Sequence, residues 1–380
     1  MRYTTAFIVL AVILADSAQQ TASAAEPAPQ YESGDIVVTA ARSDEAIRET
    51  LSAGKALEHL DHGALAWSRH RKCVTCHTNG SYMVIRPALS GQFGKPVESI
   101  REFFVEQLRD YIATDAATLQ EGTRPAQAIY VAAGLAEWDA HVTRTLSSET
   151  DEALRLMLSL QRESGTWGSL DCWPPFESSA YHLATVAAMA AATAPGWLDG
   201  LRDTQDESTL QAVARLHEYL RTTSPPHDYG RVLLLWTSTR VPGLLDRNRQ
   251  RELVEMIWSH QRNDGGWSMR TFATPDAWGG GNRADKLRAE PEHEDPPTDG
   301  HQTGLCVLVL REAGVAAKDP RLQRAVGWLK NNQRESGRWW TRSLNTDRWH
   351  FITYSSTAYA LLALAKCNAL PEESRTAAAE

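Results

Sequence analysis

The amino-acid sequence predicts an all-α protein, an (α/α)6 toroid built from six helical hairpins. Three observations predict it: a short recurring pattern, an alternation of amphipathic with wholly apolar helical segments, and the number of such pairs. The pattern is Gln-x3-Gly-x-Trp, and it occurs at 161–167, 261–267 and 333–339. Six outer–inner pairs can close into a ring; an open helical solenoid of the same repeats is the alternative.

The pairs follow one another along most of the chain. We place them roughly at 46–90, 96–141, 148–195, 206–240, 246–315 and 319–368. The clearest outer helix has Asp319 as its N-cap, Pro320 in its first turn and one apolar face, formed by Leu322, Ala325, Val326 and Leu329. Inner helices such as 184–192, 305–310 and 361–365 are apolar almost all round, which predicts burial on every side.

The recurring pattern is expected at the turn between an outer and an inner helix. Its glycine can end the outer helix in a left-handed conformation, and its glutamine amide can satisfy loose backbone groups. Its tryptophan can cover the turn. Because every outer-to-inner turn of a closed array lies on one rim, side chains carried by these turns should gather there.

The N-terminus reads as an export signal. Residues 1–24 carry Arg2, an apolar run at 6–15 and the small residues Ala22 and Ala24 before the expected cleavage site. The run is too short for a membrane span, although an N-terminal membrane anchor is the alternative. We expect a periplasmic or secreted protein with a linker at 25–43, the toroid at 44–370 and a disordered tail at 371–380.

Composition excludes some partners. The formal net charge is −8 and the chain has no basic run, so we expect no nucleic-acid partner. No second apolar stretch is long enough to cross a membrane, so the mature chain should have no membrane span.

A C-x-x-C-H motif lies in the first hairpin, where other repeats carry their turn. Cys73 and Cys76 are spaced for thioether bonds to one covalent haem c, and His77 would be the proximal iron ligand. Export agrees with this interpretation, since c-type haem is attached outside the cytoplasm. The alternatives are a reduced dithiol, a local disulfide or half of a metal site.

The other cysteines are Cys172, Cys306 and Cys367. Cys306 is early in its helix and Cys367 is near the end of the next inner one, an axial offset on the order of 10 Å. That offset exceeds the reach of a disulfide, so we expect these two to be buried thiols.

The repeats resemble the QW repeats of squalene–hopene cyclases and of protein prenyltransferase β-subunits. The sixth hairpin matches best, through Arg324, Ala325, Trp328, Leu329, Gln333, Gly337 and Trp339. The resemblance implies an apolar central cavity for an isoprenoid- or sterol-like ligand. It does not carry over the families' chemistry, because the cyclases' D-x-D-D motif is missing and Asp171 and Cys172 are adjacent, which is not the spacing of a prenyltransferase zinc pair.

Several polar residues near the turns are candidates for catalysis. We single out Glu177, Asp299, His301 and Tyr354, although each could equally be a helix cap or a satisfied buried group. Other polar residues expected on the same rim are Cys172, His182, His227, Asp228, Tyr229 and Asp347. The long connection at 268–298 carries an acidic run around His293 that could bind a cation or simply be solvated.

A haem at His77 needs a sixth ligand or an open position. In a closed ring the first and sixth hairpins are neighbours, which makes His350 the best-placed distal ligand, with His301 and Met157 behind it. An open position would favour peroxide or oxygen chemistry.

These observations lead to three hypotheses. The first is an exported haem-dependent oxidoreductase that binds an apolar small molecule and performs or relays a redox step, with a periplasmic redox partner. The second is a non-catalytic electron-transfer or ligand-binding protein with the toroid as scaffold. The third is a cyclase-like enzyme with a non-standard acid and no haem.

Overall fold

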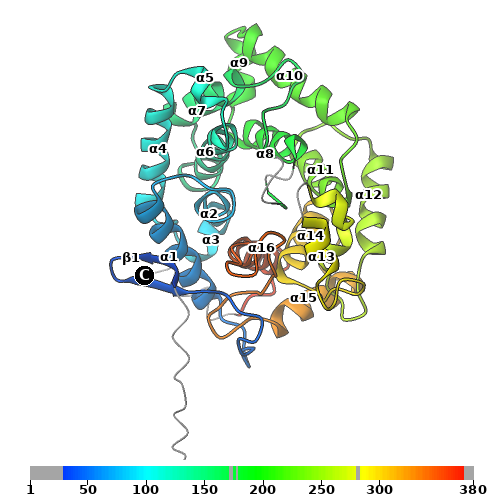
Figure 1. Ribbon diagram of the computed structural model, residues 1–380. Helices are drawn as coiled ribbons and strands as arrows, with labels where there is room; N and C mark the ends of the chain where they lie inside the picture. Colours follow the sequence, from blue (N-terminus) through cyan, green and yellow to red (C-terminus); the bar gives the residue numbers. More distant parts are fainter. Residues whose placement is uncertain (1–28, 171–173, 177–178, 280–282, 372–380) are drawn as a thin grey trace, which may run out of the picture.

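The computed structural model is a closed ring of helical hairpins (Figure 1). It describes residues 29–170, 174–176, 179–279 and 283–371. The expected signal peptide at 1–24, Cys172, Glu177 and nearly all of the expected tail lie outside these residues. Within them, no helix is long and apolar enough to cross a bilayer.

Six outer helices alternate with six inner ones, as the sequence predicts. The outer helices are α1 (Ala53–Arg71), α4 (Glu98–Ile112), α7 (Ser148–Ser159), α10 (Glu207–Thr222), α12 (Arg247–Ser259) and α15 (Pro320–Asn331). The inner helices are α2 (Asn79–Ile85), α6 (Arg124–Trp138), α8 (Ala180–Thr193), α11 (Asp228–Arg240), α14 (Gly300–Glu312) and α16 (Ile352–Lys366). Each inner helix packs on the next, and α16 packs on both α2 and α1, so the ring is closed.

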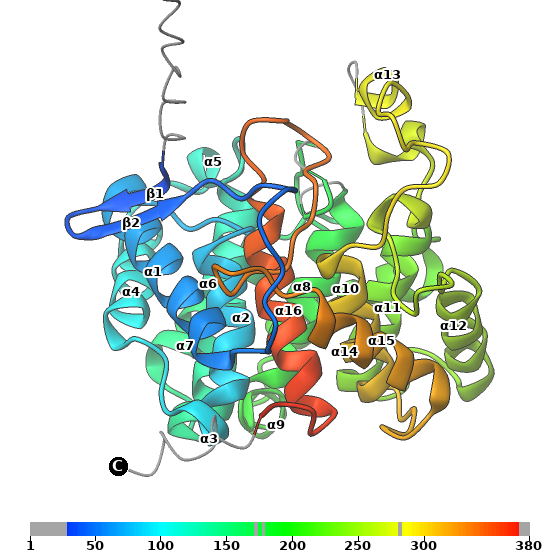
Figure 2. The same cartoon turned by 90° about the horizontal axis from the view of Figure 1, so that it is seen from below.

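Short elements lie in the connections. On one side are α5 (Ala116–Leu119), η3 (Met269–Phe272), η4 (Pro275–Trp278) and α13 (Arg283–Arg288); between hairpins are η1 (Arg86–Leu89), α3 (Ser90–Phe93), η2 (Asp139–Thr143) and α9 (Trp197–Asp203). Figure 2 shows α5, α13 and the loop between α15 and α16 at one rim, with α3 and α9 at the other. The outer-to-inner turns therefore share a rim, as expected.

The Gln-x3-Gly-x-Trp turns have the same geometry in all three copies. The indole Nε1 of Trp167, Trp267 and Trp339 donates to the carbonyl ten residues earlier, at 2.8, 2.8 and 2.7 Å. All three indoles are fully buried. The predicted equivalence of the three tryptophans is confirmed.

The glutamine of each turn ties one hairpin to the next. Gln161 Nε2 donates to the carbonyl of Gly165 within its own turn and, at 3.0 Å, to that of Ala212 in α10. Gln261 makes the same pair of bonds, the second to Arg321 in α15 at 2.8 Å. The amide thus fixes where the following outer helix begins to pack.

The third copy closes the ring. Gln333 Nε2 donates to the carbonyl of Ser52 at 2.8 Å, and its Oε1 accepts from Ser52 N at 2.7 Å. Ser52 is the N-cap of α1, so the last turn holds the first helix. Arg338, buried beside it, pairs with Glu45 at 3.1 Å. The last hairpin is joined to the first by the same glutamine hydrogen bonds that join consecutive hairpins.

We expected the turn glycine to end the outer helix, and this prediction is wrong. Helix α7 ends at Ser159 with a right-handed C-cap at Leu160, and Gly165 lies further along, inside the turn. Its φ of +87° needs glycine, and a Cβ there would lie 2.4 Å from the carbonyl oxygen of Arg215 in α10. The glycine is needed because the next helix approaches the turn closely.

The segment at 25–43, expected as a linker, contains regular structure. Strands β1 (Pro29–Ser33) and β2 (Ile36–Thr39) form an antiparallel hairpin that packs on α1. Tyr31 is buried beneath it. The alternation of polar and apolar residues is too short in this stretch to mark the strands.

The space on the ring axis is filled by side chains. Inner-helix residues that include Tyr130, His182, Trp236 and Tyr359 leave a cavity of about 20 Å³. An ion pair between Glu137 and Arg240 lies at one end of it. Because a volume of that size holds about one water molecule, the expected isoprenoid-sized cavity does not lie on this axis.

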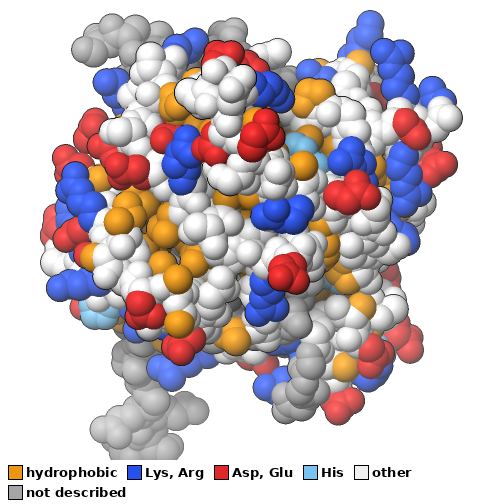
Figure 3. All heavy atoms as spheres, turned by 90° about the horizontal axis from the view of Figure 1, so that it is seen from above, with side chains coloured by type: hydrophobic (Ala, Val, Ile, Leu, Met, Phe, Trp, Pro, Cys, Tyr) orange, Lys and Arg blue, Asp and Glu red, His pale blue; other side chains and the backbone are white. Residues whose placement is uncertain are grey.

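The outward-facing surfaces are polar and of mixed sign. Figure 3 shows Lys and Arg side chains interspersed with Asp and Glu on one side of the ring. With a net charge of −8, this face has no continuous basic surface of the kind that binds a phosphate backbone.

The ring-closing contact gives a first prediction. In Gly337→Ala the Cβ would lie 2.5 Å from the backbone of Lys55, and the φ of +88° is unfavourable for alanine. Gly314 has a φ of +90° but open space around it, so Gly314→Ala tests the backbone conformation alone. We expect Gly314→Ala to lose about 1–2 kcal/mol of unfolding free energy, and Gly337→Ala to lose about 1–3 kcal/mol more. Urea unfolding measures both; equal losses would contradict the close approach.

Candidate functional site

The C-x-x-C-H segment is a tightly held loop between α1 and α2. Lys72, the C-cap of α1, takes a left-handed conformation with φ of 51° and turns the chain. The Asn79 side chain then holds the loop through two hydrogen bonds. Its Oδ1 accepts from Thr75 N at 2.9 Å, and its Nδ2 donates to the Cys73 carbonyl at 3.1 Å. Gly80 N donates to the Thr75 carbonyl at 2.8 Å. These bonds fix the loop without any bound group.

Cys73, Cys76 and His77 line one cavity at the rim. Its volume is about 650 Å³, within the range of small-molecule and cofactor sites. The wall is largely apolar and includes the aromatic rings of Trp67, Phe176, Trp349 and Phe351. The aromatic residues come from hairpins one, three and six, so the cavity exists only in the closed ring.

His77 is held between aromatic rings. Phe351 stacks on it with centroids 4.7 Å apart and planes at 23°, and Trp67 meets it edge-on at 4.9 Å. Burial lowers the pKa of His77 to about 3, so the imidazole is neutral near pH 7. The contact with Phe351 confirms that hairpins one and six are neighbours.

A chain of hydrogen bonds reaches His77 from the N-terminal hairpin. His77 Nδ1 lies 2.8 Å from Thr78 Oγ1, and that oxygen lies 3.2 Å from the Tyr31 hydroxyl. Gln30 Nε2 donates to the same hydroxyl at 3.3 Å. With Nδ1 occupied by Thr78, the Nε2 atom is the nitrogen left for a ligand.

The thiols differ in their surroundings. Cys73 is partly exposed, and burial raises the pKa of its thiol, with smaller opposing effects from Trp67 and Arg71. Cys306 and Cys367 are buried and form no disulfide, so the prediction of buried thiols is confirmed for them. Burial raises the pKa of Cys367 to about 11.

The three expected distal ligands do not line this cavity. His350 faces a different cavity, and its Nδ1 accepts from Ser343 N at 3.0 Å. Met157 is fully buried in α7. His301 is fully buried too, with Nε2 3.1 Å from the Tyr229 hydroxyl and Nδ1 3.1 Å from Ser355 Oγ. Among the described residues that line the cavity there is no second histidine and no methionine.

The other candidate catalytic residues have structural partners. Asp299 is the N-cap of α14, accepting from Gln302 N at 2.9 Å, and its other oxygen accepts from Met269 N at 2.6 Å. Tyr354 is fully buried and donates to the Leu60 carbonyl, which joins α16 to α1. Asp299 therefore acts as a helix cap, and Tyr354 is a buried group with a hydrogen-bond partner.

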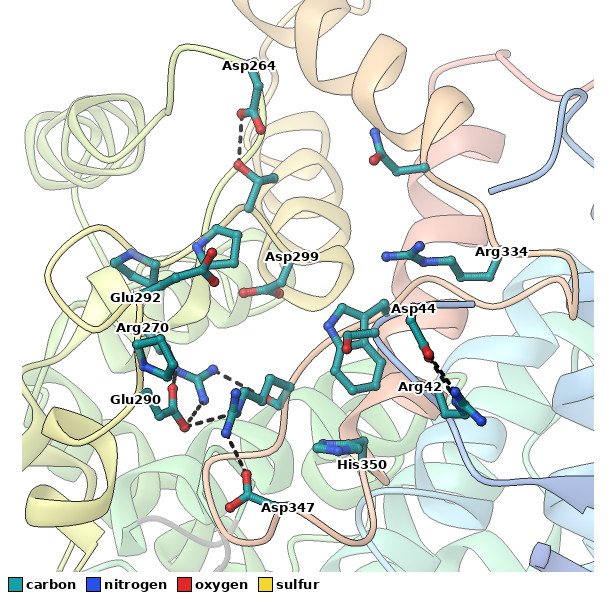
Figure 4. Close-up of a pocket in the computed structure, with 18 of the residues that line it drawn as sticks. Arg42, Asp44, Asp264, Arg270, Glu290, Glu292, Asp299, Arg334, Asp347 and His350 are labelled. Atoms are coloured by element: carbon teal, nitrogen blue, oxygen red, sulfur yellow. Dashed lines mark hydrogen bonds and ion pairs between the residues drawn. The ribbon is translucent and has the colours of Figure 1, made fainter. Parts of the chain in front are cut away.

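A second, polar cavity of about 970 Å³ lies on the same rim (Figure 4). It lies between hairpins five and six and is also lined by residues 42–44. Its charged residues are Arg42, Asp44, Asp264, Arg270, Glu290, Glu292, Asp299, Arg334, Arg342 and Asp347. His350, predicted as the distal haem ligand, and Asp299, a candidate catalytic residue, line this cavity.

The loop between α15 and α16 separates the two cavities. Asn345, Thr346, Trp349 and Phe351 line the cavity of His77, whereas Arg342, Asp347 and His350 line the polar one. His350 and Phe351 are neighbours in sequence and line different cavities. The sequence correctly indicated this loop, but not which of its residues would face His77.

The acidic run of the long connection does not gather around a cation. His293 is exposed, with its Nδ1 at 3.2 Å from the Glu290 carbonyl. Among the described residues there is no group of three His, Cys, Asp or Glu side chains that could hold a metal ion.

Sequence reasoning missed Thr78, Asn79, Tyr31 and Phe351. Thr78 and Asn79 directly follow the motif, so their positions were a signal that we did not use. Tyr31 and Phe351 are distant in sequence, and no pattern pointed to them.

Comparisons with known proteins bear on the fold alone. No protein-family model and no curated protein matches the chain. Among solved structures it is similar to the type II terpene cyclase MstE from Scytonema, at 12% identity, with 82% of this chain and 99% of that chain covered and a TM-score of 0.45. It is also similar to a wild-type glycosidase at 13% identity, with 84% and 100% covered and a TM-score of 0.47. Likenesses at this level say nothing about activity.

Buried histidines make stability depend on pH. Burial lowers the pKa of His182 and His301 to about 3, and of His227 and His350 to about 4. An unfolded histidine titrates near 6.5, so below that pH the unfolded chain binds more protons than the folded one. Their contribution is complete above pH 6.5 and is lost as pH falls toward 3–4.

We therefore expect unfolding free energy to fall below pH 6.5 by about 1.4 kcal/mol per pH unit for each such histidine. His301→Gln should lower the slope by one proton. Denaturant unfolding between pH 4 and 7 measures the slope. A slope unchanged by His301→Gln would contradict the assignment.

Proposed function

We propose that this chain is an exported c-type haem protein that performs or relays a redox step at the rim of its toroid. One haem would be bound covalently by Cys73 and Cys76, with His77 as its proximal ligand. The observation that carries the proposal is the shared cavity: all three motif residues line one space of about 650 Å³. A motif that matched by chance would not be expected to open onto such a space.

The residues fit this group chemically. His77 is neutral and its Nδ1 is engaged by Thr78, the arrangement in which the remaining nitrogen can bind a metal. Trp67, Trp349 and Phe351 offer apolar surface for a porphyrin face. When bound, the haem would supply one-electron chemistry; the protein contributes the attachment, the axial imidazole and a largely apolar wall.

A redox-active dithiol is less well supported. A thiol reacts as its thiolate, and reactive cysteines lie where positive charge lowers their pKa. Burial instead raises the pKa of Cys73. The thiol form is therefore favoured near neutral pH, which suits attachment to a cofactor better than rapid thiol–disulfide exchange.

The rim is where we propose that a substrate or redox partner binds. The axial space of about 20 Å³ is too small for an isoprenoid or a sterol. The cavity of His77 opens at the rim, and the described part of its wall offers no second histidine or methionine. We propose an open iron position opposite His77, accessible to a small ligand.

The covalent attachment can be tested directly. The full chain is produced for export together with the haem-attachment machinery, and its N-terminus is sequenced; we expect it near Ala25. Denatured protein should keep a haem stain, and reduced protein should bind carbon monoxide at the proposed open position. Cys73→Ala combined with Cys76→Ala should abolish the stain.

Cys367→Ala, which removes a thiol outside the cavity, is the matched control and should leave the stain unchanged. No covalent haem in the wild-type protein, with the machinery present, would overturn the proposal. A low-spin spectrum without carbon monoxide binding would contradict the open position alone.

The role of Thr78 gives a further prediction. A hydrogen bond from Nδ1 makes an imidazole a more basic ligand, which favours the ferric state. Thr78→Val should therefore raise the reduction potential of the haem protein. Thr75→Val, the same change at another residue lining the cavity, should not. Redox titration measures both, and equal potentials for Thr78→Val and wild type would contradict the role of this bond.

A further inference from the structure

The polar cavity between hairpins five and six has four arginines and six carboxylates in its wall, and three of the arginines are already ion-paired. Arg270 binds Glu290 through two contacts, at 2.7 and 2.8 Å. Arg342 lies 3.1 Å from Glu290 and 2.7 Å from Asp347. A charged ligand would compete with these pairs, so the cavity does not select strongly for either sign.

The wall nevertheless keeps unused hydrogen-bonding capacity of both kinds. Arg334 donates from Nη1 to the Glu45 carbonyl at 2.6 Å, and Arg42, which also lines the cavity, is exposed. Figure 4 shows Arg334 on the opposite side of the cavity from Glu292, whereas both oxygens of Asp299 are already bonded to backbone N–H groups. Glu292 is exposed. Donors and acceptors that face each other suit groups that both donate and accept, which is the property of hydroxyls.

Two partly exposed indoles complete the wall. Trp328 comes from outer helix α15, and Trp340 follows the Gln-x3-Gly-x-Trp turn of the sixth hairpin. Trp340 is braced by the ring of His350, with centroids 4.5 Å apart. An indole face offers a flat apolar surface whose surroundings stay polar. Such a surface matches the C–H face of a sugar ring.

We propose that this cavity binds an uncharged polyhydroxylated ligand, an oligosaccharide, with Trp328 and Trp340 against its rings and the surrounding carboxylates and guanidinium groups bonded to its hydroxyls. The volume of about 970 Å³ is at the upper end for small-molecule sites, which favours a chain of sugar units over a single one. The proposal is independent of the haem, because the two cavities have separate walls apart from the loop between α15 and α16.

The test is calorimetric titration of the full mature chain with four neutral probes: cellohexaose, xylohexaose, mannohexaose and maltohexaose. Oligogalacturonate and tetramethylammonium serve as anionic and cationic probes. We expect saturable binding of at least one neutral probe, and none of the charged ones at the same concentrations. Trp328→Ala and Trp340→Ala should each weaken that binding about tenfold, the effect of losing one aromatic contact of about 1.4 kcal/mol.

Trp349→Ala is the matched control, since it removes an indole from the cavity of His77. It should leave the affinity unchanged. If Trp340→Ala fails to fold by its thermal transition, Glu292→Gln replaces it and should also weaken binding. No binding by any neutral probe, binding of a charged probe in their place, or an affinity lowered only by Trp349→Ala would each overturn the proposal.

Discussion

The rest of the structure depends on one hydrogen-bonded contact, from the amide of a turn glutamine to the backbone of the next outer helix. Gln161 and Gln261 make it between consecutive hairpins, and Gln333 makes it to Ser52 across the chain's two ends. In all three copies the amide nitrogen donates to a backbone carbonyl of that helix, and in the last copy the amide oxygen also accepts from Ser52 N, a backbone N–H at a helix start. Because the last copy binds the first helix, the array is a ring rather than an open solenoid.

Ring closure is what creates the rim. The outer-to-inner connections that carry α5, α13 and the loop before α16 lie on the same side (Figure 2), so residues far apart in sequence meet above the inner helices. Phe351 reaches His77 across the seam, and Tyr31 reaches Thr78 from the N-terminal hairpin. The loop between α15 and α16 then divides the rim into an aromatic cavity and a polar one. A single connection thereby gives the protein two neighbouring sites of opposite character.

Large side chains occupy the centre of the ring, which leaves little space for a ligand there. An inner helix that is apolar on all sides has to be packed on all sides, and large residues such as Trp236 and Tyr359 occupy the centre. Buried Glu137 pairs with the partly exposed Arg240 at one end of the small cavity that remains. The two larger cavities described above lie instead at the rim, where connections differ in length and composition. Asp299, which looked catalytic in sequence, serves α14 as a cap because its two oxygens are used by backbone donors.

The sequence by itself determined the helices, their pairing and the turn that repeats, because periodicity, caps and the Gln-x3-Gly-x-Trp pattern act over a few residues. It also placed the C-x-x-C-H motif at an outer-to-inner turn and predicted that hairpins one and six are neighbours. It could not decide that Phe351 rather than His350 faces His77, since adjacent residues in a loop point in directions set by distant contacts, here the bond from Ser343 N to His350. Nor could it show that the axis is filled. Whether the inward-facing side chains fill the centre or leave a cavity depends on the diameter of the ring, and tertiary packing alone determines that diameter.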